Sequence, residues 1–159
     1  MIDVFCYFSK KDIIYPKHKS RCTMEKNISL TFHHIGKPVS LQMIQHNKNT
    51  KYSPLFDMYS LDLENDLSIP IELHAFGPNS SLDVRIQTEI HIAFTTNDIE
   101  YVLTGKEIIM PLYQPFAHYR CAMVSINGQL IEFIETSLSE KEIWGEGIFK
   151  DSILYPQDK

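Results

Sequence analysis

Hydrophobic and polar residues alternate with a period of two through much of this chain. The longest such run spans residues 82–94, where alternate positions are apolar or threonine and most of the others are polar. Successive side chains of a strand point to opposite faces, so this run predicts one long strand with a solvated face. A second alternating run spans residues 67–75, and turn-forming residues 77–81 separate the two. We therefore expect an antiparallel pair, with Pro70 marking an edge strand or a bulge.

A hairpin that turns at Asn127-Gly128 is the sharpest local prediction. Asn-Gly supplies the two positive φ angles of a type I′ turn, which joins antiparallel strands through two residues. The flanking strands are expected over residues 117–126 and 129–138. Placing Ile126 opposite Gln129 gives these further cross-strand pairs: Val124 with Ile131, Ala122 with Phe133, Cys121 with Ile134, Arg120 with Glu135 and Tyr119 with Thr136. Apolar pairs near the turn and one pair of opposite charge would stabilise this hairpin.

Weaker strand candidates, bounded by turn residues, fill much of the remaining chain. They are residues 2–8, 28–35, 39–45, 55–63, 99–103 and 107–113. At most one short helix is expected, near residues 138–144, where Ser137 and Glu140 fit a capping box and Gly145 would end it. Residues 10–26 are expected to form a polar, basic loop.

The predicted fold is a single all-β domain over residues 1–159. About eight short strands with turn signals between them are typical of a sandwich or a barrel. Because the strands differ in length and several are apolar on both faces, we expect an antiparallel β-sandwich, immunoglobulin-like or jelly-roll-like. The closing hairpin, with Tyr119 three residues after Phe116, resembles the last hairpin of many immunoglobulin-like domains. The Cys…Trp…Cys spacing of that family is absent, since Trp144 follows every cysteine.

The composition, 43% hydrophobic and 22% charged, is that of a globular protein. No apolar run approaches the roughly 20 residues of a membrane span. The first eight residues carry an acid, Asp3, where a signal peptide has basic charge. The three cysteines, Cys6, Cys22 and Cys121, lack CxxC spacing, which predicts reduced thiols and a cytoplasmic location.

Charge is unevenly divided along the chain. Residues 1–51 hold nine basic and three acidic residues, whereas the rest hold six basic and seventeen acidic. The mixture of basic and aromatic residues before residue 26 could suit single-stranded nucleic acid, but a pI near 5.8 disfavours that role. An acidic protein partner is the preferred interpretation. The expected contact residues are Lys10, Lys11, Lys17, Lys19 and Arg21 of this segment and the aromatic residues Phe76, Tyr113 and Phe116, which we expect on exposed faces.

No catalytic or metal-binding motif stands out in the sequence. The spacings HxH, HxxxH, CxxC and GxSxG are all absent. Adjacent residues on a strand point to opposite faces, so His33 and His34 are not expected to bind one ion together. Cys22 lies among basic residues and is predicted to be the most reactive thiol. We therefore predict no catalytic residue, no metal and no cofactor.

The leading functional prediction is a non-enzymatic interaction module, such as an accessory, adaptor, immunity or viral component, that binds another protein or a second copy of itself. The first alternative is an enzyme or ligand-binding β-barrel with a pocket lined by histidine and glutamate. Convergence of Arg85, Glu89 and His91 with His74 or His118 in one concavity would favour that alternative. The second alternative is nucleic-acid binding through the basic N-terminal segment.

Overall fold

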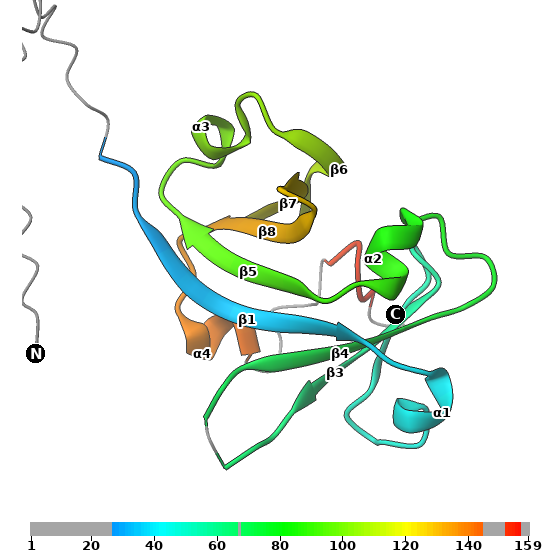
Figure 1. The fold of residues 1–159 in the computed structure, drawn as a ribbon. Helices are drawn as coiled ribbons and strands as arrows, with labels where there is room; N and C mark the ends of the chain where they lie inside the picture. The colour runs from blue at the N-terminus through cyan, green and yellow to red at the C-terminus, as the bar shows by residue number, and fades with distance from the viewer. Residues whose placement is uncertain (1–26, 67, 145–151, 157–159) are drawn as a thin grey trace, which may run out of the picture.

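The computed structural model, which describes residues 27–66, 68–144 and 152–156, contains one curled, eight-stranded mixed sheet that forms a half-barrel (Figure 1). The prediction of a mostly β protein is confirmed. The strand order across the sheet is β2-β3-β4-β1-β5-β8-β7-β6. The elements are β1 (Leu30–Pro38), α1 (Leu41–Ile44), β2 (Lys51–Ser53), β3 (Met58–Leu63), β4 (Ile71–Phe76), α2 (Val84–Thr88), β5 (His91–Thr96), α3 (Ile99–Leu103), β6 (Glu107–Phe116), β7 (Tyr119–Ile126), β8 (Gln129–Thr136) and α4 (Glu140–Trp144).

The two halves of the sheet repeat one topology. Each half runs strand, short helix and then three strands, from β1 to β4 and from β5 to β8, and α2 connects the halves. In each half the first strand pairs in parallel with the last, β1 with β4 and β5 with β8. The first strands of the halves, β1 and β5, pair antiparallel at the centre. The parallel pairs distinguish this sheet from the predicted antiparallel sandwich.

The two faces of the sheet have different partners. On the outer face, α1 packs against β3 and β4, and α3 packs against β8. The buried residues of these two outer clusters are Ile44, Leu61, Leu73 and Ala75 in the first half and Ile99, Val124 and Phe133 in the second. Side chains alternate along a strand, so the neighbours of Leu73 and Phe133 point to the concave face.

The prediction of one long strand over residues 82–94 is wrong. Residues 84–88 form α2, and β5 begins only at His91. The side chain of Asp83 caps the helix by accepting a hydrogen bond from the backbone N–H of Arg85 at 2.8 Å. Of the alternating apolar positions, Ile86 is buried while Val84 is 67% exposed, so they do not form one buried face.

The expected partner of that strand is also placed differently. Residues 71–76 form β4, which lies between β3 and β1 in the interior of the sheet. Pro70 lies just before β4, so its missing N–H removes no hydrogen bond of that strand, and the prediction of an edge strand or bulge is wrong. Its carbonyl accepts a hydrogen bond from the backbone N–H of Ile35 at 3.0 Å.

Short helices are more numerous than predicted. Part of the predicted strand 39–45 forms α1, which has no side-chain cap, and the predicted strand 99–103 forms α3, which Asp98 caps. The predicted short helix is confirmed as α4, but its capping box uses Ser139 and Glu142. In the part of the chain that the structure describes, no helix has the length and apolar character needed to span a membrane.

Three other strand predictions, residues 28–35, 55–63 and 107–113, correspond to β1, β3 and β6. The predicted strand 2–8 and the basic loop 10–26 lie outside the described residues.

The hairpin at Asn127-Gly128 is confirmed, including its register. Both turn residues have positive φ, 51° for Asn127 and 85° for Gly128. All of the predicted cross-strand pairs between β7 and β8 are present. The local sequence specifies the register of this hairpin, because the turn type determines which residues face each other.

Candidate functional site

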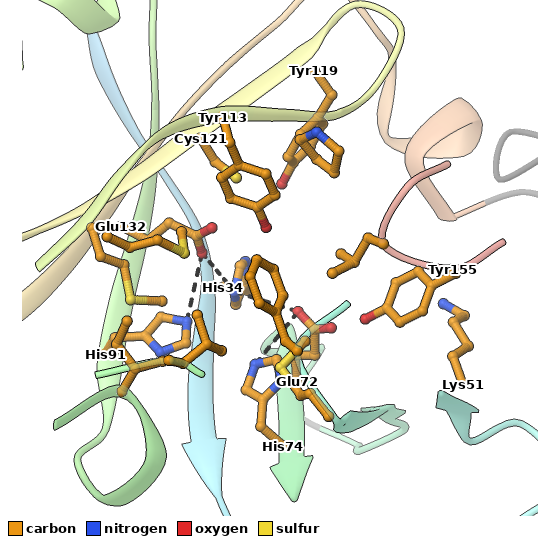
Figure 2. Close-up of a pocket in the computed structure, with 18 of the residues that line it drawn as sticks. His34, Lys51, Glu72, His74, His91, Tyr113, Tyr119, Cys121, Glu132 and Tyr155 are labelled. Atoms are coloured by element: carbon orange, nitrogen blue, oxygen red, sulfur yellow. Dashed lines mark ion pairs between the residues drawn. The ribbon is translucent and has the colours of Figure 1, made fainter. Parts of the chain in front are cut away.

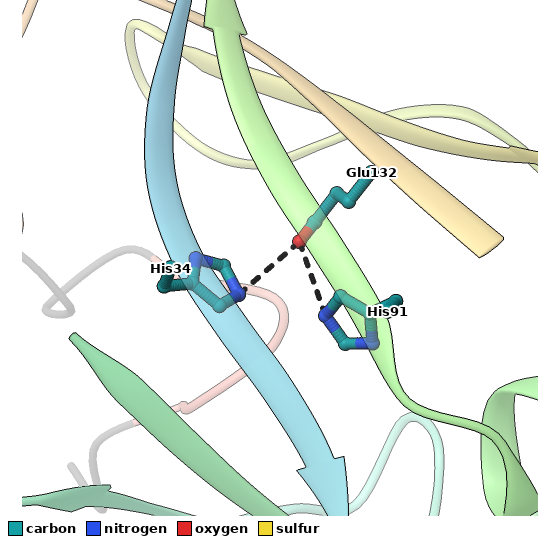
Figure 3. A group of neighbouring side chains, drawn as sticks. All are labelled: His34, His91 and Glu132. Carbon is teal, nitrogen blue, oxygen red and sulfur yellow. Dashed lines mark ion pairs between the residues drawn. The ribbon is translucent and has the colours of Figure 1, made fainter. Parts of the chain in front are cut away.

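The concave face of the half-barrel carries a buried cluster of imidazoles and carboxylates (Figure 2). Its centre consists of His34 on β1, His91 on β5 and Glu132 on β8 (Figure 3). One ligand-type atom of each side chain lies within 4.8 Å of those of the other two. The Nε2 atoms of His34 and His91 lie 3.4 Å and 3.5 Å from Oε2 of Glu132. Donors about 2.1 Å from one ion are roughly 3.0 Å apart at octahedral angles and roughly 3.4 Å apart at tetrahedral angles, so small movements of these side chains allow a shared ion.

Glu72 extends this cluster through the repeated topology. The parallel register pairs Glu72 with Gly36, which lies two residues after His34. In the second half the register pairs Glu132 with Ala93, which lies two residues after His91. Glu72 therefore occupies the position in the first half that Glu132 occupies in the second. Its Oε2 lies 3.6 Å from Nε2 of His34, so the repeat contributes two histidines and two glutamates to one place.

Gly36 provides the space that the cluster needs. It lies on β1 between Glu72 of β4 and His91 of β5 in the sheet register. A Cβ atom at this position would overlap the imidazole ring of His91. The absence of a side chain on β1 therefore allows the ring to lie over that strand.

Several buried nitrogens of the cluster have no hydrogen-bond partner among the described residues. They are Nε2 of His34, Nε2 of His74 and both ring nitrogens of His91. A buried polar atom without a partner costs about 1–3 kcal/mol. Such atoms are rare in folded proteins, where an ion, a ligand or an ordered water usually completes them.

Burial and mutual interaction shift the titration of the cluster. Burial lowers the pKa of His34 to about 4, although Glu132 opposes the shift. Burial alone would raise the pKa of Glu132, but the neighbouring imidazoles of His91, His34 and His33 lower it to about 2. Burial raises the pKa of Glu72 to about 8, with help from the nearby carboxylates. Near pH 7 without a metal, the cluster thus combines an ionised Glu132 with a neutral His34, which favours a cation.

The cluster forms one wall of a cavity with a volume of about 100 Å³. The remaining wall is mostly apolar and aromatic and includes Phe56, Phe76, Met110, Phe116 and Met123. Tyr113, Tyr119 and Tyr155 also line the cavity, and burial raises the pKa of each hydroxyl well above the usual range. An apolar cavity with a few convergent polar groups is the usual form of a small-molecule site.

The aromatic residues predicted to bind a partner from exposed faces lie in this cavity wall. Phe76 and Tyr113 are partly buried, and Phe116 is only 7% exposed. Their expected exposure was wrong, while a role in binding stays a prediction. The other predicted contacts, Lys10, Lys11, Lys17, Lys19 and Arg21, lie outside the described residues.

The convergence that would favour a pocket is partly present. The rings of His74 and His91 stack with centroids 5.6 Å apart and planes 28° apart. Arg85 of α2 instead pairs with Glu89, the residue after this helix, at 3.1 Å. His118 is exposed in the turn between β6 and β7.

His33 and His34 do not point to opposite faces, which corrects the expectation from strand alternation. A register shift between Phe32 and His34 makes a bulge in β1 where it pairs with β5. The bulge interrupts the alternation, and the Nδ1 atoms of the two rings lie 2.7 Å apart.

Cys121 also lines the cavity, directly opposite Ile134 as the hairpin predicted. Its burial raises the pKa of the thiol well above its usual range, so the thiolate needed of a nucleophile is disfavoured. Cys6 and Cys22 lie outside the described residues.

Sequence reasoning missed the cluster because its members come from four strands and share no short spacing. A weak signal was present in the internal repeat. The tripeptide His34-Ile35-Gly36 is similar to His91-Ile92-Ala93, and Ile71-Glu72-Leu73 is similar to Ile131-Glu132-Phe133. Each histidine lies near the start of its half and each glutamate near the end.

Comparison with known proteins supports the fold alone. No family model matches the chain, and no curated protein matches it. The crystal structure of hypothetical protein BH1468 from Bacillus halodurans C-125 is similar, with a TM-score of 0.51 and 22% sequence identity. The match covers 70% of this chain and 97% of that protein.

Proposed function

We propose that this chain is a metal-dependent enzyme that holds a divalent transition-metal ion on the concave face of its half-barrel. The observation that carries this proposal is the convergence of His34, His91 and Glu132, from three strands, to within 4.8 Å of one another. Their imidazole nitrogens lie close to Glu132 without a hydrogen bond, and they supply the lone pairs that a metal requires. Imidazole together with carboxylate suits zinc, nickel, cobalt or iron better than calcium or magnesium.

Glu72 lies outside the group within 4.8 Å, but its Oε2 lies 3.6 Å from Nε2 of His34, and it is the fourth protein ligand of this proposal. With a substrate oxygen also bound, the ion then has five or six ligands. A nearby cation stabilises a carboxylate, so Glu72 loses its proton when the ion binds. Two histidines and two glutamates on a rigid sheet hold the ligand atoms in place without large movements.

The substrate of this enzyme is a small, largely apolar molecule with an oxygen-bearing group. A divalent ion acts as a Lewis acid toward such an oxygen, for example that of a carbonyl. The residues of the chain bury that group against the cluster while the aromatic and methionine side chains exclude water. The proposal thus takes up the alternative of a pocket lined by histidine and glutamate.

A metal titration of the purified chain tests the proposal. After treatment with a chelator, the wild-type protein should bind one Zn²⁺ or Co²⁺ ion in isothermal titration calorimetry. His91→Leu should weaken binding by more than about 100-fold, since even residues outside the ligand set commonly contribute 10- to 100-fold. His46→Leu is the matched control because His46 is exposed and lies on the segment after α1. Equal affinity in wild type and His91→Leu would refute the site.

Two other roles remain proposals of their own. The hypothesis of protein binding can no longer use Phe76, Tyr113 and Phe116 as exposed contacts, because these residues line the cavity. Nucleic-acid binding rests on residues outside the described part of the chain. A cytoplasmic location also stays a prediction.

A further inference from the structure

His74 is a fifth titratable side chain of the cluster, and its ring is held on two sides. It lies on β4 two residues after Glu72 and therefore on the same concave face. Its Nδ1 atom lies 3.1 Å from Oγ of Ser60, a buried residue directly opposite it on β3. Its ring also stacks on that of His91. A metal ligand or substrate contact usually has such a second partner that sets its orientation.

The other nitrogen of this ring faces the cavity. Nε2 of His74 lies 3.8 Å from Oε2 of Glu72, too far for a hydrogen bond, and has no partner among the described residues. His74 does not belong to the compact group whose ligand atoms all lie within 4.8 Å of one another. Glu72 also lies outside that group, but its Oε2 lies 3.6 Å from Nε2 of His34, whereas Nε2 of His74 contacts Glu72 itself at 3.8 Å (Figure 2). We therefore place Nε2 of His74 beside the metal position and not within the ligand set.

We propose that Nε2 of His74 makes a hydrogen bond to the molecule bound at the metal and so orients that molecule beside the ion. This inference rests on the proposed function and narrows its substrate class. The substrate carries a second polar group next to the oxygen that contacts the metal, within reach of His74. The rest of the molecule is apolar and lies against the aromatic wall.

Acetohydroxamate is a suitable probe because it is small, binds divalent metals through two adjacent oxygens and carries an N–H group. The experiment uses the full chain loaded with Co²⁺ and follows hydroxamate binding by visible absorption. His74→Leu should weaken hydroxamate binding by about tenfold, the effect of losing one hydrogen bond. The loss of Co²⁺ affinity should be much smaller than that caused by His91→Leu, because His74 stacks on that ligand but contributes no donor atom to the ion. His74→Gln, which keeps polar atoms at the end of the side chain, should restore most of the hydroxamate affinity.

The outcomes separate this inference from the proposed function. Failure of the wild-type chain to bind Co²⁺ would refute both the proposed metal site and the role of His74. Normal Co²⁺ binding with equal hydroxamate affinity in wild type and His74→Leu overturns the role of His74 alone. Loss of Co²⁺ binding in a folded His74→Leu variant also overturns it, because His74 would then be a metal ligand. Thermal unfolding establishes whether the variant is folded.

If His74→Leu does not fold, Ser60→Ala takes its place. This change removes the partner of Nδ1 and leaves the His74 ring less well oriented. Weaker hydroxamate binding with unchanged Co²⁺ affinity supports the proposal, and unchanged hydroxamate binding overturns it.

Discussion

Gly36 has no side chain, and this determines where the imidazole of His91 can lie. The glycine is on the central strand β1, flanked by a glutamate of the cluster on one side and by His91 on the other. Its φ is not positive, so backbone conformation does not require glycine at this position. The requirement is spatial, because any Cβ would overlap the ring of His91.

Gly36→Ala should therefore displace His91 and weaken metal binding while the fold is kept. We expect a loss of at least tenfold in Zn²⁺ affinity by isothermal titration calorimetry, since displacement of a ligand costs no less than the loss of an outer partner. Gly105→Asn is a matched control, because Gly105 has open space around it and Asn tolerates its φ of 70°. Wild-type affinity in Gly36→Ala would show that the ring can move without consequence.

The titration of single residues predicts an optimum in the pH dependence of stability. In the folded, metal-free chain the pKa of His34 is about 4 and that of His74 about 3, whereas both are 6.5 when unfolded. The unfolded chain therefore binds more protons below pH 6.5, and stability falls as the pH drops. Glu72 has the opposite effect, because its folded pKa of about 8 exceeds the ordinary 4.5 and stability falls as the pH rises toward 8.

Between pH 4.5 and 6.5 the two histidines outweigh the single glutamate, so the melting temperature in the presence of a chelator should be highest near pH 6.5. Each proton of difference changes the free energy of unfolding by about 1.4 kcal/mol per pH unit. Thermal unfolding followed by circular dichroism from pH 4 to pH 9 measures the curve. Glu72→Gln should remove the decline above pH 6.5. A melting temperature that keeps rising to pH 8 in wild type would contradict the assignment.

At the scale of elements, irregularities in β structure place the site. The bulge in β1 brings His33 against His34, and the cap at Asp83 turns an alternating segment into α2. The Asn127-Gly128 hairpin is regular by contrast and holds Glu132 of β8 in register with β7. Stability of the hairpin should thus depend on its turn, independently of the metal site.

Gly128→Ala should lower the free energy of unfolding by about 1–2 kcal/mol, the cost of left-handed backbone for a residue with a Cβ. The φ of Gly128 is 85°, and an added Cβ would meet nothing within 4 Å, so the cost is conformational and not steric crowding. Urea denaturation monitored by fluorescence measures the change. Gly128→Asn should cost less, because asparagine tolerates positive φ. Equal stability of Gly128→Ala and wild type would show that the turn can change type.

At the scale of the whole molecule, the site lies where the two repeated halves meet. The central pair of strands, β1 and β5, contributes the two histidines, and the strands beside them, β4 and β8, contribute the two glutamates. An approximate two-fold relation between the halves makes Glu72 and Glu132 equivalent in register. Neither half contains a complete set of ligands.

This equivalence predicts that both glutamates contribute to metal-induced stability. An ion that binds only the folded chain adds about 2.7 kcal/mol to the free energy of unfolding when its free concentration is 100 times its Kd. Glu72→Gln and Glu132→Gln should each lose much of the Zn²⁺-induced rise in melting temperature. Glu89→Gln should keep the full rise, because Glu89 follows α2 and pairs with Arg85. A full rise in Glu72→Gln together with its loss in Glu132→Gln would remove Glu72 from the ligand set.

Local sequence was sufficient to predict the features of this protein that depend on neighbouring residues. The hairpin register, the existence of α4 and the mostly β character follow from turn chemistry, capping and side-chain alternation. It misjudged the segments where strand-like alternation competes with a helix cap, as in α2 and α3. These segments are short, and alternation cannot distinguish them from strands when a cap favours the helix.

The site itself depends on tertiary structure. His34, Glu72, His91 and Glu132 are far apart along the chain and come together because parallel pairing returns the last strand of each half beside the first. The sequence carries the repeated pairs His-Ile and Ile-Glu, but no rule of local spacing relates residues that meet across a sheet. The order of the strands in the sheet brings these four residues into one buried cluster, and Gly36 leaves room for the ring of His91 within it.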